Sequence, residues 1–246
     1  MIKTILAELQ QFSTPIKKRK AVFFKTGPGE YAEHDQFMGV PTPRLREIAK
    51  RYRGLSLKLI SKLLQSSVNE VRLLALMMLV EAYQKGNQST REEVFQLYFS
   101  HKQYVNNWNL VDASAHYILG AYLYDYALNK KLLLSLASSE IMWERRIAIV
   151  STWYFIRKNE FDWTIKISKI LLSDKHDLIH KAVGWMLREV GKRDQARLLA
   201  FLDTHAVKMP RTTLRYAIEK LPLESRREYL QLARNKTQVR HSRGVY

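Results

Sequence analysis

The sequence predicts an all-α protein, built as a curved α-solenoid of two-helix repeats with a basic concave surface. Three observations lead to this prediction: helix-breaking residues are rare, apolar residues recur at helical spacing, and a short alanine-containing segment repeats along the chain. Only 9 Gly and 6 Pro occur in 246 residues. The stretches between them have apolar residues three and four positions apart, the spacing of helices rather than strands.

The N-terminal region contains two predicted helix starts with a loop between them. Ser13 or Thr14 precedes Pro15, and Thr42 precedes Pro43. A short hydroxyl side chain can cap the first amides of a helix, and proline suits its first turn. The glycine-containing segment 25–41, KTGPGEYAEHDQFMGVP, is therefore predicted to be a loop or a loop with a short turn.

Segments with an alanine among large apolar residues recur at a nearly constant interval. The alanines that mark them are Ala75, Ala113, Ala148, Ala182 and Ala217, at steps of 38, 35, 34 and 35 residues. This period fits a two-helix repeat in which the small side chain allows helices to approach closely. The alternative is chance, because alanine is common in helices. Since no linker interrupts the series, we expect one domain over residues 1–246, with a basic and loosely ordered tail from about 235 to 246.

The composition restricts the possible functions. Lys and Arg total 41 against 23 Asp and Glu, a formal net charge of +18, which favours nucleic acid as a partner first and an anionic membrane second. The chain has no cysteine, which excludes disulfides, a thiol nucleophile and Cys-based zinc sites. Because neither a secretory signal nor a long apolar span is evident, we expect a cytoplasmic protein without a membrane partner.

Segment 106–112, NNWNLVD, contains the first candidate site. Asn106 or Asn107 can cap a helix that begins here, and Trp108 and Asp112, four residues apart, share a face of its first two turns. Structural roles are also open: the indole can fill a groove, and the carboxylate can pair with His116 or with an arginine of the next repeat.

Segment 143–150, WERRIAIV, contains two neighbouring arginines that fall on different sides of its predicted helix. The apolar face of this predicted helix consists of Trp143, Ile147, Val150 and Tyr154. Arg145 lies on the opposite side, whereas Arg146 borders the apolar face. Arg146 is therefore the better candidate for a cleft residue, although a salt bridge would explain it equally well.

The segment that follows Asp177 contains the clearest row of cations, with one tryptophan among them. These residues recur at spacings of four, three and four: Lys181, Trp185, Arg188 and Lys192. Cations beside an indole can neutralise phosphates while the ring packs against sugar or base. Further cations follow at Arg211 and Arg215, and the N-terminal half adds the run KKRK at 17–20 together with Arg44 and Arg46. We expect the KKRK run to add positive charge. The cations that we expect to contact DNA are Lys181, Arg188, Lys192, Arg211, Arg215, Arg44 and Arg46.

Motifs for other chemistries are incomplete. His176 and His180 have the spacing of a metalloprotease pair, but HDLIH lacks its glutamate, and TGPGEY lacks a Walker lysine. The motif GxSxG is missing as well. We therefore expect neither a metal nor a cofactor.

The motifs together resemble the AlkD-like DNA alkylation repair family of HEAT-like repeat DNA glycosylases. The resemblance covers nearly the whole chain and rests on the order and spacing of several short motifs: FFKTGPGEY, FMGVPTPRLREIAKRY, NNWNLVD, MWERRIAIV, KAVGWMLREVGKRD and PRTTLRYAIEK. In that family, residues of these motifs line a concave DNA-binding cleft. The positions of this sequence that match those cleft residues are Trp108, Asp112, Arg146 and Trp185, which the helical spacing also singles out.

The resemblance implies a reaction: removal of cationic purines alkylated at N3 or N7, such as 3-methyladenine or 7-methylguanine, from double-stranded DNA. Asp112 is suited to stabilise the developing oxocarbenium charge and to orient water. Trp108 and Trp185 would border the lesion, and Arg146 would grip phosphate or hold Asp112. No lysine has the motif context of a Schiff-base residue, so we expect a monofunctional enzyme. We also expect a monomer, because a solenoid with a DNA-sized concavity can work alone.

Two other classes of function remain open. A non-catalytic solenoid could recognise damaged or branched DNA by charge and shape. A protein-interaction scaffold could present its concave surface to peptides. The scaffold predicts a concave surface that is mixed or acidic rather than dominated by cations.

Overall fold

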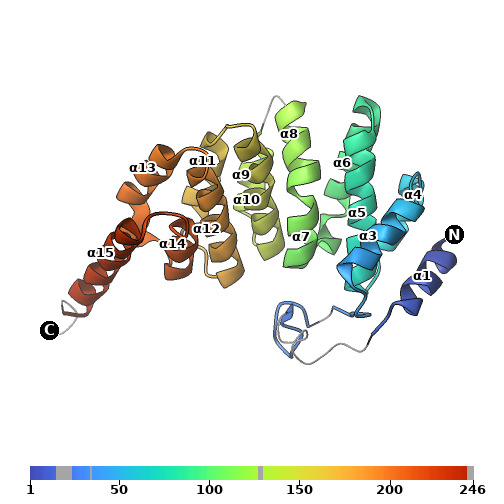
Figure 1. The fold of residues 1–246 in the computed structure, drawn as a ribbon, viewed down its shortest axis with the longest axis horizontal. Coiled ribbons are helices and arrows are strands. Elements are labelled where there is room, and N and C mark those ends of the chain that lie inside the picture. Colours follow the sequence, from blue (N-terminus) through green and yellow to red (C-terminus); the bar gives the residue numbers. More distant parts are fainter. Residues whose placement is uncertain (15–23, 34, 127–129, 243–246) are drawn as a thin grey trace. The chain divides into compact units, whose positions relative to one another are not determined.

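The computed structural model describes residues 1–14, 24–33, 35–126 and 130–242 and divides into two compact units, Met1–Asp125 and Tyr126–Tyr246. Within these residues the regular structure is helical, and the sole β-type contact is an isolated parallel bridge between Gln36 and Val68. The predicted all-α class is confirmed for this part of the chain (Figure 1).

The first unit is organised around one long buried helix. Its helices are α1 (Ile2–Gln11), α3 (Thr42–Arg51), α4 (Leu57–Leu64), α5 (Asn69–Lys85), α6 (Gln88–Ser100), the 3₁₀ turn η1 (Lys102–Tyr104), α7 (Trp108–Ser114), the π-helical turn η2 (His116–Gly120) and α8 (Ala121–Asp125). Helix α5 packs against α3, α4, α6 and α7. Leu73, Leu74, Ala75 and Leu76 are all buried, so α5 is apolar around its whole circumference, as expected of a core helix.

The two predicted helix starts have different outcomes. Helix α3 begins at Thr42 as expected, but its N-cap is Pro41 and no side chain caps it, so Thr42 is the first helical residue rather than the cap. Ser13 and Thr14 donate their hydroxyl hydrogens to the carbonyl oxygens of Met38 and Gly39 at 2.8 and 3.0 Å. The helix predicted after Pro15 falls outside the described residues.

The loop predicted at 25–41 is irregular, with turns, over its described residues. Its C-terminal end is fastened to α5, because the Glu70 carboxylate accepts hydrogen bonds from the amides of Gly39 at 2.8 Å and Met38 at 3.0 Å. Gly39 has φ of +77°, and a Cβ there would lie 2.0 Å from the Thr14 carbonyl oxygen. Glycine is therefore required where the N-terminal segment crosses the loop.

The second unit contains two interleaved sets of helices (Figure 1). Its helices are α9 (Leu132–Ala137), α10 (Met142–Arg157), α11 (Asp162–Leu171), α12 (Asp177–Gly191), α13 (Gln195–His205), the 3₁₀ turn η3 (Ala206–Lys208), α14 (Arg211–Ala217) and α15 (Leu223–Ser242). Helices α10, α12 and α14 pack side by side, and α9, α11 and α13 alternate with them along the chain.

The alanines of the predicted repeat lie on one set of helices within each unit. Ala75 and Ala113 belong to α5 and α7, which pack together, and Ala148, Ala182 and Ala217 belong to α10, α12 and α14. The last three are at most 1% exposed. At the α12–α14 contact even a methyl group on Gly184 would lie 2.5 Å from the Tyr216 Cβ. Small residues therefore allow these helices to approach closely.

Helix α15 extends into the predicted C-terminal tail, as far as Ser242. Residues 223–242 contain neither Gly nor Pro, so no helix breaker ends α15 within them. That the tail is loosely ordered stays a prediction.

Candidate functional site

Helix α7 presents Trp108 and Asp112 as the sequence predicted. Asn107 is its N-cap, and its side-chain oxygen accepts a hydrogen bond from the Trp108 amide at 2.8 Å. Trp108 is therefore the first helical residue, and Asp112 follows one turn later on the same face. Both are half-buried, which leaves part of each side chain accessible. The chain then passes into η2, and π-helical turns of this kind often occur at functional sites.

A buried polar network that the sequence did not predict lies beside the start of α7. The carboxylate of Asp35 accepts hydrogen bonds from the side-chain amides of Asn69 at 2.9 Å and Asn107 at 2.8 Å, and it forms an ion pair with Arg72. Asp35 lies in an irregular loop with no periodic pattern, and Asn107 is 72 residues further along the chain. Spacing along the sequence could not reveal contacts at this separation.

Trp108 also has an aromatic contact from Phe24, the residue before this loop. The ring of Phe24 stacks on the Trp108 ring, with centroids 5.2 Å apart and planes 13° apart. Phe37 of the loop packs against Phe24 at a centroid distance of 4.7 Å. The glycine-containing loop, whose role the sequence did not indicate, is therefore linked to a candidate site residue through Phe24.

In the second unit, the two neighbouring arginines on α10 have different partners. Arg145 donates from Nε to Asp174 at 2.6 Å and from a terminal nitrogen to the Ser139 and Glu140 carbonyl oxygens, each at 2.9 Å. Arg146 is 4% exposed and donates to the Leu178 carbonyl oxygen in the first turn of α12. The two neighbouring arginines, which the sequence placed on different sides of the helix, therefore have different partners.

Burial raises the pKa of Asp174, but the hydrogen bonds from Arg145 and from the His176 amide outweigh that effect. The pKa of Asp174 is therefore held below its ordinary value of 3.8. The carboxylate consequently stays charged beside Arg145, which identifies this pair as part of the structural framework of the unit.

Helix α12 carries the predicted row of cations and Trp185 beside a buried apolar face. Ala182, Val183 and Met186 are at most 1% exposed. The Trp185 ring is half-buried and meets Trp153 of α10 edge to face, with centroids 5.0 Å apart. Aromatic contact within the fold therefore accounts for one part of Trp185 and leaves another part accessible.

Each cation of the α12 row has an acidic partner. Lys181 pairs with Asp177 at 2.7 Å, Lys192 pairs with Glu189 at 2.7 Å, and Arg188 pairs with Glu219. The Lys181 and Lys192 side chains are 41% and 42% exposed. Ion pairs this exposed contribute little stability, so a phosphate can replace the acidic partner at small cost.

The remaining predicted DNA contacts are also at the surface of their units. Arg211 donates to the Leu230 carbonyl oxygen at 3.1 Å, and Arg215 is exposed on the same helix, α14. On α3, Arg44 pairs with Glu47 at 2.6 Å and lies 5.0 Å above the Phe12 ring, while Arg46 is exposed. The KKRK run at 17–20 lies outside the described residues.

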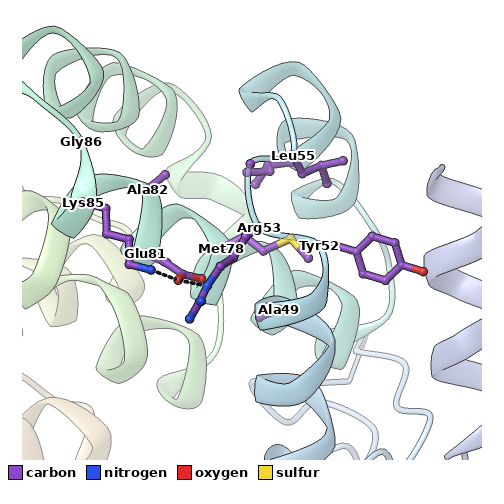
Figure 2. Close-up of a pocket in the computed structure, with 11 residues that line it drawn as sticks. Ala49, Tyr52, Arg53, Leu55, Met78, Glu81, Ala82, Lys85 and Gly86 are labelled. Carbon is purple, nitrogen blue, oxygen red and sulfur yellow. Dashed lines mark hydrogen bonds and ion pairs between the residues drawn. The ribbon is translucent and has the colours of Figure 1, made fainter.

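A pocket of about 260 Å³ in the first unit contains none of the predicted site residues. Ala49, Ile60, Met78 and Ala82 contribute its apolar lining. Figure 2 shows Lys85 and Arg53 both directed at the Glu81 carboxylate beside it, with Lys85 at 2.8 Å. Hydrogen bonds from these two cations outweigh burial and lower the Glu81 pKa.

Among the described residues, neither a metal-binding cluster nor a membrane-spanning helix is found. These residues contain no group of three or more His, Cys, Asp and Glu side chains placed to hold a metal ion. Within the same residues, every helix is too short or too polar to cross a membrane. His180, from the HDLIH segment, has its Nε2 atom 2.6 Å from the Asp174 carbonyl oxygen.

Comparison with known proteins gives a family match and matches to four chains of solved structures, two of which are described below. The sequence model of the family described as DNA alkylation repair enzyme matches residues 5–221. A predicted DNA alkylation repair enzyme from Enterococcus faecalis is similar in fold, with a TM-score of 0.63 and 19% identity over 84% of this chain and 94% of that chain. AlkD2 from Streptococcus mutans is similar with a TM-score of 0.50 and 16% identity over 88% and 96%. The curated proteins gave no match.

Proposed function

This chain belongs to the DNA alkylation repair enzyme family, and from that premise we propose that it is a monofunctional DNA glycosylase. The proposed substrate is duplex DNA that contains a purine alkylated at N3 or N7. The reaction is hydrolysis of the N-glycosidic bond, which releases the alkylated base and leaves an abasic site.

The reaction requires the protein to stabilise a developing positive charge and to position a water molecule. Alkylation at N3 or N7 gives the purine a formal positive charge, which makes the base a good leaving group. As the bond to the base breaks, positive charge develops on the deoxyribose. A carboxylate fixed nearby stabilises that charge and can orient the attacking water, which requires neither a metal nor a cofactor.

The observation that carries the proposal is the placement of Asp112. It lies one turn from the capped start of α7, shares a face with Trp108, and remains half-exposed. We propose that Asp112 is the catalytic carboxylate and that Trp108 borders the lesion, where its ring offers a cation–π contact to the charged nucleotide.

The second unit contributes DNA contacts in this proposal. Trp185 would pack against sugar and backbone, and the surrounding cations would neutralise phosphates. Because Arg146 is 4% exposed and bound to the Leu178 carbonyl oxygen, its role would be positioning α12 rather than gripping phosphate. The DNA-contacting cations would be Lys181, Arg188, Lys192, Arg211, Arg215, Arg44 and Arg46.

The proposed architecture follows from the repeated helix pairs in each unit. We propose that they form one HEAT-like α-solenoid domain whose cationic residues face DNA on a concave surface. The protein would act as a monomer in the cytoplasm.

The test is release of free base from duplex DNA that carries a single 7-methylguanine, measured over time for the wild type and for Asp112→Asn. We expect release by the wild type and almost none by the variant. The affinity of the variant for the same duplex should be unchanged or slightly higher, because one negative charge near phosphate is removed. If binding by the variant collapses, Asp112 has a structural role instead.

The competing proposal is a non-catalytic DNA-binding protein, and the same experiment separates the two. The exposed Lys181 and Lys192 beside Trp185 would bind DNA without help from Asp112. A wild-type protein that binds duplex DNA tightly and with strong salt dependence, yet releases no base, would establish this alternative.

A further inference from the structure

Asp35 joins two helices of the first unit through a single carboxylate. Its Oδ2 atom accepts hydrogen bonds from Asn69, at the start of α5, and from Asn107, the N-cap of α7, at 2.9 and 2.8 Å. Its Oδ1 atom is paired with Arg72. The Asp35 side chain is 5% exposed and that of Arg72 is 4% exposed, so water does not weaken these bonds.

The buried charges are matched by partners. Arg72 neutralises Asp35 and also donates to the carbonyl oxygens of Ser66 and Ser67 at 2.8 and 3.0 Å. Hydrogen bonds to the other polar atoms of a buried ion pair offset part of its desolvation cost, although Arg72 Nε has no hydrogen-bond partner among the described residues. The network therefore fixes the Asp35 carboxylate firmly relative to the segment that leads into α5.

Asn107 passes this constraint on to α7. Its side-chain nitrogen donates to Asp35, while its side-chain oxygen accepts from the Trp108 amide at 2.8 Å. Asn107 is fully buried, and the amides of Leu110 and Val111 donate to its carbonyl oxygen. A second link joins Asn109 of α7 to the Asn69 side chain at 2.7 Å.

We propose that Asp35 is a positioning residue, which acts through Asn107 to fix the start of α7 and with it Trp108 and Asp112. This inference rests on the proposed glycosylase function, since Asp112 is the group whose placement would affect the reaction. Electrostatic stabilisation of a developing charge depends strongly on distance, so a small displacement of the carboxylate reduces the rate.

Phe24, which precedes the loop of Asp35, also contacts the start of α7. Its ring stacks on Trp108, so the first residue of α7 is held by its side chain as well as by its amide, which Asn107 caps. Phe24, and Asp35 acting through Asn107, therefore hold the same helical turn.

Asn107→Ser is the sharpest test. Serine keeps the N-cap acceptor but is too short to reach Asp35, so the helix start survives while its link is cut. Replacing Asp35 itself would leave Arg72 buried without a counterion and endanger folding. Tyr98→Phe is the matched control, because it removes a buried hydrogen bond of 3.2 Å to Ser114, at the opposite end of α7.

The first readout is single-turnover release of 7-methylguanine from duplex DNA. For Asn107→Ser we expect the rate constant to fall roughly 10- to 100-fold, as small misplacements of catalytic groups do. Its Kd for the same duplex should change little, because phosphate contacts set that affinity. Tyr98→Phe should keep the wild-type rate constant at a comparable loss of thermal stability. Equal rate losses in both variants would overturn the proposal.

The second readout does not need excision. Hydrogen exchange at the Trp108, Leu110 and Val111 amides should accelerate in Asn107→Ser and not in Tyr98→Phe. If the wild type releases no base but this pattern appears, the proposed function fails and the positioning role of the network stands. Unchanged exchange in Asn107→Ser would reject the positioning role, whatever the excision assay shows.

Discussion

Arg145 and Asp174 form a contact whose strength depends on pH. The Asp174 side chain is 4% exposed, and its lowered pKa means that the native state holds the charged form more tightly than the unfolded chain does. The resulting stability is present above the ordinary pKa of 3.8 and is lost as pH falls through the lowered value.

We therefore expect Asp174→Asn to lower the free energy of unfolding by about 3 kcal/mol at pH 7, because Arg145 loses its buried partner. The variant should also lose less stability than the wild type between about pH 5 and pH 3. Urea unfolding at several pH values measures both effects. Asp162→Asn is the control, since that carboxylate is 77% exposed in its pair with Arg197 and should contribute under about 1 kcal/mol. A pH profile for Asp174→Asn that parallels the wild type would contradict the assignment.

At the residue scale, sequence reasoning succeeded where interactions are local. The Asn107 cap, the shared face of Trp108 and Asp112, and the different partners of Arg145 and Arg146 all follow from spacing on one helix. Asp35 could not be found this way, because its partners Asn69 and Asn107 come from distant parts of the chain. Thr42 was misplaced by one position, since an extended Pro41 can serve as the N-cap residue without a side-chain bond.

At the scale of elements, α12 combines a packing face and a candidate binding edge. Lys181 and Lys192 lie at opposite ends of this edge, each exposed and each paired with a neighbouring acid. In the proposed complex each lysine would exchange its carboxylate for one phosphate. Such contacts hold any DNA sequence and release counterions when they form.

We expect Lys181→Ala and Lys192→Ala to weaken binding to all duplex sequences. Each should flatten the plot of log affinity against log salt by about 1 unit, the contribution of one phosphate contact. Fluorescence anisotropy at several salt concentrations measures the slope. Lys62→Ala on α4, an exposed lysine outside the proposed contacts, should leave the slope unchanged. If the α12 variants behave like Lys62→Ala, these lysines lie away from the DNA path.

The elements were easier to predict than their ends. Periodicity identified helices because few Gly and Pro interrupt the chain, and the alanine spacing indicated which helices pack together: α10, α12 and α14 do so in the second unit. The composition of 235–242 does not predict a helix there, because Asn, Thr, Val, His and Ser are weak helix formers. The lack of Gly and Pro allows α15 to extend to Ser242.

At the scale of the whole molecule, the net charge of +18 favours binding to any nucleic acid and cannot by itself select a lesion. Phosphates are the same in damaged and undamaged duplex, whereas the alkylated base differs at one position. In the proposed function, charge would therefore account for affinity, and the carboxylate and indoles of the proposed site would account for the reaction. A peptide-binding scaffold would need neither property.

If charge sets the affinity and the site residues set the reaction, the dependence of DNA affinity on salt can be predicted. If 6–10 phosphates are contacted, affinity for duplex DNA should fall by about 10³–10⁵ between 50 and 200 mM salt. Because the slope counts phosphates, it should be equal for duplexes with and without a 7-methylguanine, even though only the first is a substrate. Parallel titrations of the two duplexes measure this. A steeper slope for the damaged duplex would mean that lesion recognition brings further cations onto the backbone, and a flat slope for both would favour the protein scaffold over either DNA-binding hypothesis.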